Sequence, residues 1–292
     1  MQAALEQMRQ RVAEAGYIAD QGLLTSLWLM NELSRPLLLE GDAGVGKTEV
    51  GKTLATIYDR KLIRLQCYEG LDVNTAVYEW NYQHQLLSIR RQEILHQDNI
   101  SEEQLFSDDY LLKRPLLQSI SEPQPAVLLI DEIDRADEEF EAYLLEVLSD
   151  FQISIPELGT IKASSIPLVI LTSNGTRELS DALRRRCLYH YIDYPDYDKE
   201  LRIVLARVPD IGNRLASQIV NFVQKLREQD LRKLPGVAET LDWASALLQL
   251  KMESLGDNPD AVVATLGCLL KTREDQDAMP PEMVHRLVAK AS

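Results

Sequence analysis

PLLLEGDAGVGKTEV, residues 36–50, is the stretch that decides the fold. Its core, Gly41–Thr48, matches the phosphate-binding pattern G-x-x-x-x-G-K-[ST] at every fixed position. The three leucines before this core are typical of a buried parallel strand, and Thr48–Tyr58 can continue as a helix, which places the glycines at a strand-to-helix turn. Backbone N–H groups can converge on phosphates at such a turn, because the helix directs its positive end toward them. The stretch therefore predicts a binding site for a nucleoside triphosphate.

The residue types of this loop define its expected contacts. Lys47 is expected to reach the β- and γ-phosphates, and the Thr48 hydroxyl is expected to ligate Mg²⁺. The predicted cofactor-binding residues of the loop are Gly41, Gly44, Val45, Gly46, Lys47, Thr48 and Glu49. The alternative, a glycine turn with a solvated lysine, is disfavoured by a complete match in the right setting.

Composition excludes several classes of protein. A chain of 292 residues is expected to form two domains, and no apolar window approaches the length of a transmembrane helix. The N-terminal segment is charged and helical rather than a signal peptide, so we expect a cytoplasmic protein without membrane insertion. The three cysteines are far apart and lack C-x-x-C spacing, which argues against disulfides and a zinc site. The net charge of −15 disfavours a nucleic-acid partner, although a few basic residues can still build a local basic channel.

Five apolar, β-prone runs mark the first two-thirds of the chain. They are Arg35–Leu39, Leu62–Cys67, Ala126–Ile130, Pro167–Leu171 and Leu188–Tyr194. Helical patterns separate these runs, which predicts an α/β fold: an αβα sandwich with a five-stranded parallel sheet.

Three connecting segments need separate interpretations. The sequence RLQCYEGLDVNTAVYEWNY, residues 64–82, is expected to leave the second strand and enter another helix. Gln92–Gln124 is polar and interrupted by prolines, and it is interpreted as a helix, a loop and a further helix. Phe151–Ala163 alternates β-branched and polar residues around Gly159, which predicts a β-hairpin.

After residue 195 the strand-like runs stop and helical patterns follow. The expected helices are Lys199–Val208, Ile211–Arg227, Val237–Met252, Asp260–Thr272 and a short one near Pro281–Ala291. We therefore predict an α/β domain over residues 1–195 and a small all-α domain over residues 196–292.

The third predicted strand ends in two carboxylates, Asp131 and Glu132. A buried strand of this form delivers acids to the carboxyl edge of a sheet. There Asp131 would hold Mg²⁺, directly or through water, and Glu132 would polarise the water that attacks the γ-phosphate. The alternative is that these are solvated acids at a helix start. We adopt that alternative only for the acids that follow, which are Asp134, Asp137, Glu138 and Glu139.

Two further polar elements lie between the fourth predicted strand and the fifth. Asn174 would lie beside the two acids if its strand neighbours theirs, and it could then orient water or contact the γ-phosphate. The alternative is that Asn174 is a plain turn residue. Thr172 is interpreted as an ordinary strand-end residue. The sequence LSDALRRRC, residues 179–187, carries three successive arginines on a helix. Successive helical residues diverge by about 100°, so only one or two of them can serve one site. An arginine supplied to the γ-phosphate of a neighbouring subunit would stabilise the transition state, whereas a solvated basic patch is the alternative.

With these elements in this order, the first two-thirds of the chain resembles the nucleotide-binding core of an AAA+ ATPase, and the C-terminal helices resemble the lid of that family. The predicted hairpin Phe151–Ala163 and the disrupted second helix around Gln66–Arg91 resemble the helix-2-insert clade. The phosphate loop, Cys67–Asp72 and Glu239–Trp243 look like the MoxR branch, and in particular its carbon monoxide dehydrogenase maturation type.

The resemblance implies a role for each matching residue. The family's functional positions fall here on Lys47 and Thr48 (Walker A), Asp131 and Glu132 (Walker B), Asn174 (sensor 1), and Arg186 (arginine finger), with Arg185 as the second choice. Tyr17 and Ile18 resemble the residues that pack on adenine, and a hydrophobic staple of the N-terminal helix is the alternative.

One position departs from the family pattern. Where many relatives carry a sensor 2 arginine, this chain reads PGVAET, residues 235–240. Arg232 or Lys233 could substitute from nearby.

The resemblance implies an ATP- and Mg²⁺-dependent remodeller that assembles as a ring, expected to be a hexamer. Its expected partners are a von Willebrand factor A domain protein and a client metalloenzyme. The hairpin tip, Pro156–Gly159, is expected to face the pore or the partner, or to be an exposed turn without a role. A DNA-transaction ATPase of the clamp-loader or helicase-loader type is the main alternative, and a P-loop kinase or a nucleotide-gated interaction module is a third.

Overall fold

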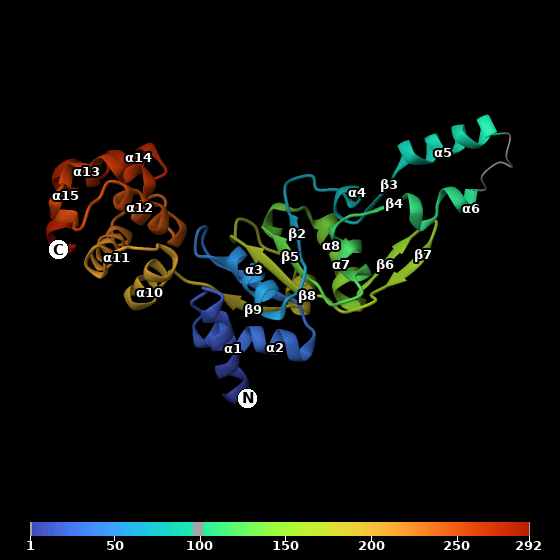
Figure 1. The fold of residues 1–292 in the computed structure, drawn as a ribbon, viewed down its shortest axis with the longest axis horizontal. Coiled ribbons are helices and arrows are strands. Elements are labelled where there is room, and N and C mark those ends of the chain that lie inside the picture. The colour runs from blue at the N-terminus through green and yellow to red at the C-terminus, as the bar shows by residue number, and fades with distance from the viewer. Residues whose placement is uncertain (1, 96–101, 292) are drawn as a thin grey trace. The chain divides into compact units, whose positions relative to one another are not determined.

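The computed structural model describes residues 2–95 and 102–291 of the chain, which forms two compact units (Figure 1). The first unit contains Met1–Met8, Gln21–Glu40 and Val50–Tyr191. The second contains Arg9–Asp20, Gly41–Glu49 and Ile192–Ser292. The phosphate loop therefore belongs to the same unit as the C-terminal helices. The division into domains at residues 195 and 196 stays a prediction.

A five-stranded, all-parallel sheet forms the centre of the first unit. Its strands are β1 (Leu37–Glu40), β2 (Leu62–Gln66), β5 (Val127–Asp131), β8 (Leu168–Ser173) and β9 (Leu188–Tyr191). Their order is β2-β5-β8-β1-β9. Each of the five predicted runs forms one of these strands, so the predicted parallel sheet is confirmed.

Helices cover both faces of this sheet. On one face, the alternating residues Leu38, Leu128 and Leu171 join the core beneath α7 (Pro115–Ser121), α8 (Glu138–Asp150) and α9 (Asp181–Arg186). On the opposite face, Gly51 of α3 (Lys47–Tyr58) lies against Leu129, so close that a Cβ at this glycine would be 3.2 Å from the leucine methyl groups. α2 (Gln21–Leu33) packs on β1 and β9. This arrangement confirms the predicted αβα sandwich.

The connection between β2 and β5 differs from the prediction. It contains the helices α4 (Val73–Ala76), α5 (Tyr82–Leu95) and α6 (Glu102–Leu105), and the antiparallel strands β3 (Tyr78–Trp80) and β4 (Leu111–Lys113). Two predictions are therefore wrong at the positions of these strands: the single helix after β2, and the helix–loop–helix over residues 92–124. Within the second prediction, residues 96–101 lie outside the described residues. Three-residue strands are too short to show an alternating pattern, and their partners lie about 30 residues apart in the chain.

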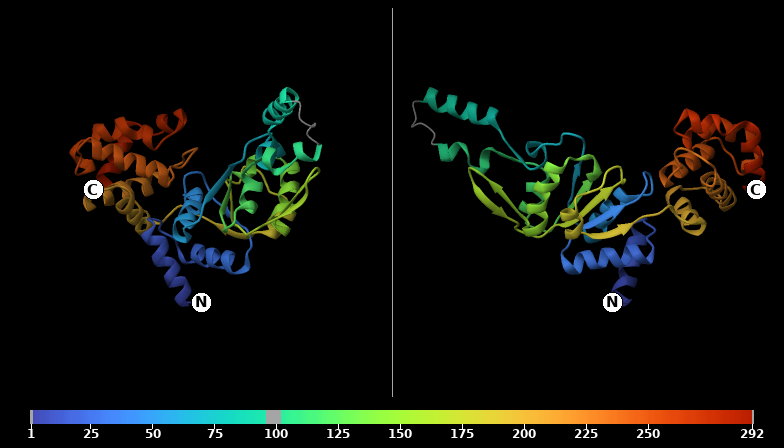
Figure 2. Two further views of the ribbon diagram at one scale, coloured as in Figure 1. Left: turned by 45° about the vertical axis from the view of Figure 1, so that its right-hand side comes forward. Right: turned by 180° about the vertical axis from the view of Figure 1, so that it is seen from behind.

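The hairpin predicted over residues 151–163 is confirmed. It consists of β6 (Gln152–Ile155) and β7 (Gly159–Lys162), and Gly159 at its tip has φ of +77°, a conformation that suits glycine. Figures 1 and 2 show the hairpin and α5 toward the same end of the first unit, beyond α7 and α8.

Helices make up the C-terminal part of the second unit, as predicted. They are α10 (Tyr197–Arg207), α11 (Asn213–Arg227), α12 (Val237–Gln249), α13 (Pro259–Thr265), α14 (Arg273–Asp277) and α15 (Pro281–Ala291). Phe222 and Trp243 pack in their core with ring centroids 5.0 Å apart. The single helix expected over Asp260–Thr272 is wrong, because the chain passes into a 3₁₀ turn around Gly267, a residue that costs about 1 kcal/mol in a helix interior.

The N-terminal helix α1 spans Gln2–Glu14. None of the helices among the described residues combines the length and the apolar character needed to cross a membrane.

Candidate functional site

The phosphate loop is held by its own lysine and by its glycines. The buried ammonium group of Lys47 donates hydrogen bonds to the carbonyl oxygens of Gly41 and Asp42, at 2.6 and 2.7 Å. A Cβ at Gly41 would lie 2.2 Å from the carbonyl oxygen of Ile192, and Gly44 and Gly46 have φ of +83° and +97°. Glycine is therefore required at each of these three loop positions, either by space or by backbone conformation.

The first turn of α12 is hydrogen-bonded to this loop within the second unit. The carbonyl oxygen of Gly44 accepts from the backbone N–H of Val237 at 3.0 Å and of Ala238 at 3.3 Å. Contact is so close at Gly236 that a Cβ there would lie 2.9 Å from the carbonyl carbon of Gly44. Glu239 caps the turn, since its carboxylate accepts from the Gly236 N–H at 3.0 Å. The segment that departs from the family pattern, residues 235–240, thus contacts the phosphate loop through backbone groups.

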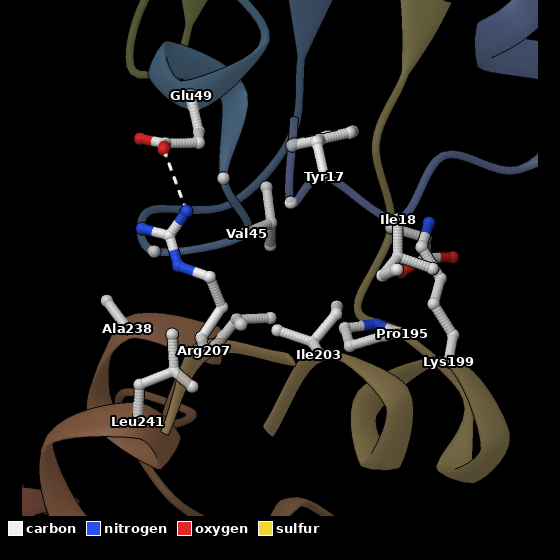
Figure 3. Close-up of a pocket in the computed structure, with 15 residues that line it drawn as sticks. Tyr17, Ile18, Val45, Glu49, Pro195, Lys199, Ile203, Arg207, Ala238 and Leu241 are labelled. Carbon is white, nitrogen blue, oxygen red and sulfur yellow. Dashed lines mark hydrogen bonds and ion pairs between the residues drawn. The ribbon is translucent and has the colours of Figure 1, made fainter. Parts of the chain in front are cut away.

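A mostly apolar pocket opens beside the loop (Figure 3). Its volume is about 190 Å³, many times the roughly 10–15 Å³ that one water needs on the same measure. Tyr17 and Ile18 line it, together with Val45 and with side chains from the helical region that include Ile203 and Leu241. The structure therefore brings the two residues predicted to pack on a base together with the predicted phosphate-binding loop.

Charged side chains also line this pocket. Arg207, at the end of α10, forms an ion pair with Glu49 at 3.0 Å, which Figure 3 shows as a dashed line. Lys199 pairs with Asp20, also at 3.0 Å. Burial raises the pKa of Tyr17, and the nearby carboxylates of Asp20 and Glu49 raise it further, so its hydroxyl stays protonated.

Arg207 is a residue that the sequence interpretation missed. Its only sequence signal is a basic residue in the last turn of a helix, which is common. The expected substitutes for a sensor 2 arginine lie elsewhere: Arg232 is an exposed side chain 3.7 Å from Glu274, and Lys233 donates its backbone N–H to Asp275. Arg207 is the one arginine among the described residues that line the pocket.

The predicted metal ligand Asp131 lies in the first unit, at the carboxyl end of β5. Its side chain is 3% exposed, and both of its oxygens accept hydrogen bonds. Oδ1 accepts from the Thr172 hydroxyl on β8 at 2.5 Å, and Oδ2 accepts from the Arg64 guanidinium on β2 at 2.5 and 3.1 Å. Neighbouring strands on both sides therefore orient this carboxylate.

Glu132 leaves the strand in an unusual backbone conformation. It has φ of +56°, in the left-handed region that is uncommon for a residue with a Cβ. Its backbone N–H donates to the Thr172 hydroxyl at 2.9 Å, and its side chain pairs with Arg135 at 2.7 Å. The Thr172 hydroxyl thus bonds to the Asp131 carboxylate and to the Glu132 backbone, and its interpretation as an ordinary strand-end residue is wrong.

The loop after β8 also contacts the segment that follows the two acids. β8 neighbours β5, as Asn174 requires if it is to lie beside the acids. Asp134 is only 3% exposed and accepts from the Thr176 N–H at 3.0 Å and from the Thr176 hydroxyl at 2.6 Å. Burial opposes its charge, but these bonds and the Asn174 N–H outweigh burial and hold the pKa of Asp134 below its ordinary value. Its predicted role as a solvated acid is wrong, because it joins two loops.

The three arginines of α9 diverge, as helical geometry requires. Arg186 donates to the Ser149 hydroxyl on α8, whereas Arg184 lies over the Tyr189 ring with its guanidinium carbon 6.0 Å from the centroid. Arg185 is exposed, and its carbonyl oxygen accepts from Arg35 at 2.7 Å. A catalytic role for Arg186 or Arg185 stays a prediction.

The donor types in the chain fit a magnesium ion that arrives with a nucleotide. Asp131 in the first unit and Thr48 in the second each carry an oxygen ligand of a type that Mg²⁺ accepts, and a joint role for them stays a prediction. Mg²⁺ is commonly bound by one or two protein ligands together with substrate phosphates. No group of three or more His, Cys, Asp or Glu side chains within residues 2–95 and 102–291 could hold a metal ion by itself. The residues therefore suit a shared ion better than a resident one.

Residues 36–187 match the family model described as AAA domain, dynein-related subfamily. The chain belongs to this family.

The chain is similar to several individual proteins. It is 28% identical over 211 residues to the gas vesicle ATPase GvpN of Haloferax mediterranei, which covers 69% of this chain and 58% of that protein. The chain therefore spans less than two thirds of the length of this relative. An uncharacterized protein of Staphylococcus aureus is 28% identical over 226 residues, which covers 75% of this chain and 78% of that protein.

A solved structure, the RuvB Holliday junction branch migration motor of Thermotoga maritima, matches with a TM-score of 0.44 and 16% identity. The match covers 90% of this chain and 68% of that one. No function is transferred from it.

Proposed function

We propose that this chain binds ATP at the phosphate loop and hydrolyses it to ADP and phosphate. One observation carries the proposal: a single apolar pocket joins Tyr17 and Ile18 to a loop that matches the phosphate-binding pattern completely. The apolar walls suit a nucleobase, and the loop glycines leave backbone N–H groups open to phosphates. The pocket and the loop therefore fit the two ends of one nucleotide.

The catalytic roles within this proposal follow from the chemistry of each group. Lys47 would exchange its hydrogen bonds to loop carbonyls for phosphate oxygens, and Thr48 and Asp131 would hold Mg²⁺, which supplies charge neutralisation when bound. Glu132 would accept a proton from the attacking water, and Asn174 would orient that water. Thr172 would position both residues, because its hydroxyl donates to the Asp131 carboxylate and accepts from the Glu132 backbone N–H.

We further propose that the chain works as a ring, expected to be a hexamer, in which Arg186 reaches the nucleotide of a neighbouring subunit. Arg186 is exposed at the end of α9, and Arg185 remains the second choice. A guanidinium group placed at the γ-phosphate stabilises the charge of the transition state.

The target protein of this ATPase is proposed from resemblance alone. The motifs that resemble the MoxR branch support a protein remodeller in the cytoplasm that acts with a von Willebrand factor A domain partner in metalloenzyme maturation. Similarity to proteins named gas vesicle ATPase supports the broader statement, that the chain is an ATPase.

The test compares two variants with the unmodified protein. Glu132→Gln should bind a fluorescent ATP analogue and release no phosphate over many turnovers, whereas Arg186→Ala should bind normally and lose turnover at least about a hundredfold. Mixing inactive Glu132→Gln with inactive Arg186→Ala should restore part of the activity if the finger acts between subunits. Sustained turnover by Glu132→Gln would refute the assigned chemistry, and strong stimulation by DNA would favour a DNA-transaction ATPase instead.

A further inference from the structure

An arginine side chain contacts the carboxylate that is proposed to hold the metal ion. Arg64 donates from Nη2 and Nε to Oδ2 of Asp131, at 2.5 and 3.1 Å, and from Nη2 to Oε1 of Gln66 at 2.6 Å. The carboxylate is 3% exposed, whereas the arginine side chain is 49% exposed. A buried anion is thus compensated by a cation that remains in contact with solvent.

The alternation of β2 places these groups together. β2 reads LIRLQ, in which Ile63 and Leu65 turn into the core and the residues at positions 64 and 66 turn to the opposite face. The register pairs Gln66 with Asp131 and Arg64 with Leu129, two residues earlier on β5. All of these side chains therefore share one face, and a guanidinium group from position 64 reaches the end of β5.

A divalent cation that approaches the Asp131 carboxylate meets the guanidinium group already bonded to Oδ2, and the two positive charges repel each other. We propose that Arg64 holds the place of the divalent cation at Asp131 when no nucleotide is bound, and that metal binding requires the guanidinium group to leave Oδ2. Arg64 is thereby a positioning residue that sets the metal concentration the chain needs. This inference rests on the proposed role of Asp131 as a metal ligand.

The surroundings of Arg64 allow such an exchange. Its head is half-exposed, so leaving Oδ2 returns it to water without opening the hydrophobic core. Gln66 offers an acceptor on the same strand to which the displaced guanidinium group can remain bonded. The carboxylate meanwhile keeps its hydrogen bond from Thr172 and exchanges one cation for another.

The test compares Arg64→Gln, which removes the charge, with Arg64→Lys, which keeps it. Binding of Mn²⁺ in the presence of ADP is followed by electron paramagnetic resonance, and the Mg²⁺ dependence of binding is followed with a fluorescent ATP analogue. Arg64→Gln should lower the half-saturating metal concentration roughly tenfold, the effect of one unit charge about 6 Å from a divalent ion in a dielectric close to that of water. Arg64→Lys should stay within about threefold of the unmodified protein. Equal metal dependence for Arg64→Gln and the unmodified protein would overturn the proposal.

Two further variants separate the possible explanations. Lys61, the residue before β2, pairs with Glu122 at 2.6 Å. Lys61→Gln therefore removes a nearby cation without touching Asp131 and should leave the metal dependence unchanged. Asp131→Asn should abolish the metal response. A normal metal response in Asp131→Asn would refute the proposed function itself, whereas its loss together with an unchanged Arg64→Gln would refute only the inference about Arg64.

A measurement on the unmodified protein covers the case in which Arg64→Gln does not fold. The Nε–H resonance of Arg64 is assigned by its absence from the spectrum of Arg64→Lys. Addition of Mg²⁺ with ADP should shift this resonance and speed its exchange with water, because the bond to Oδ2 is lost. An unshifted, still protected resonance at saturating Mg²⁺ and ADP would contradict the exchange.

Discussion

Replacing Thr172 by valine should weaken both the fold and catalysis, because one buried hydroxyl holds two acids. The hydroxyl donates to Asp131 at 2.5 Å and accepts from the backbone N–H of Glu132 at 2.9 Å, and the residue is 1% exposed. A hydrogen bond to a charged group contributes about 1.5–3 kcal/mol and a neutral one about 0.5–1.5 kcal/mol. Since valine has nearly the same shape, the free energy of unfolding should fall by about 2–4 kcal/mol.

The catalytic effect follows from the backbone of Glu132. A residue with a Cβ at φ of +56° carries strain of about 1–3 kcal/mol and keeps this conformation only while its surroundings hold it. Loss of the bond from its N–H should let the residue relax and move its carboxylate. Displacement of a catalytic group by about 1 Å can cost roughly a hundredfold, so kcat should fall tenfold to a hundredfold while binding of ATP changes little.

The assay combines urea unfolding, steady-state phosphate release and binding of a fluorescent ATP analogue. Thr172→Ser is the matched control, since it keeps the hydroxyl and loses only a methyl group. It should lie close to the unmodified protein in kcat, with a smaller loss of stability. If Thr172→Val and Thr172→Ser have the same unfolding free energy and the same kcat, the hydroxyl does not hold the acids and the reasoning fails.

Three further predictions test other contacts. Gly236→Ala should raise the Kd for the nucleotide analogue about tenfold, because the added Cβ pushes α12 away from the phosphate loop. Gly212→Ala is the control, because open space surrounds this glycine at the start of another helix, and it should leave the Kd unchanged. Equal Kd values for the two variants would exclude the contact. Because the folded-state pKa of Asp134 lies below its ordinary value of about 3.9, its contribution to stability is lost as the pH falls through that range. Acid unfolding of Asp134→Asn should therefore be less steep, and an unchanged pH profile would argue against the bonds. Burial raises the pKa of Cys67 and Cys187 to about 12, so at pH 8 roughly 10⁻⁴ of each thiol is present as thiolate. Neither cysteine should react with a thiol reagent until urea unfolds the chain. Labelling of either cysteine in the native protein, located by mass spectrometry, would contradict their burial.

Local patterns were sufficient where a feature depends on residues close together in the chain. The apolar run before Gly41, the run that ends at Asp131 and the turn at Gly159 each lie within a few residues, and each forms the expected element. The insert between β2 and β5 could not be predicted in the same way. Tyr78–Trp80 pairs with Leu111–Lys113, and two strands of three residues are stable only through that distant partner.

The same distinction applies to the candidate site. Thr172, Arg64 and Arg207 are ordinary residues in their local sequence, and none of them belongs to a recognised motif. Their partners are Asp131 for the first two and Glu49 for the third, at sequence separations of 41, 67 and 158 residues. Strand register and helix packing decide which of these side chains meet.

The sequence by itself predicted a nucleoside triphosphate site that begins at Gly41, because the physical needs of phosphate binding are met by consecutive backbone groups and a single strand-to-helix turn. It also determined the parallel sheet, since five apolar runs separated by helices have few other arrangements. Only the tertiary structure decided that α12 bonds to Gly44 through its backbone and that Arg64 compensates the charge of Asp131. Such contacts depend on the register of distant segments, which no local pattern in the chain encodes.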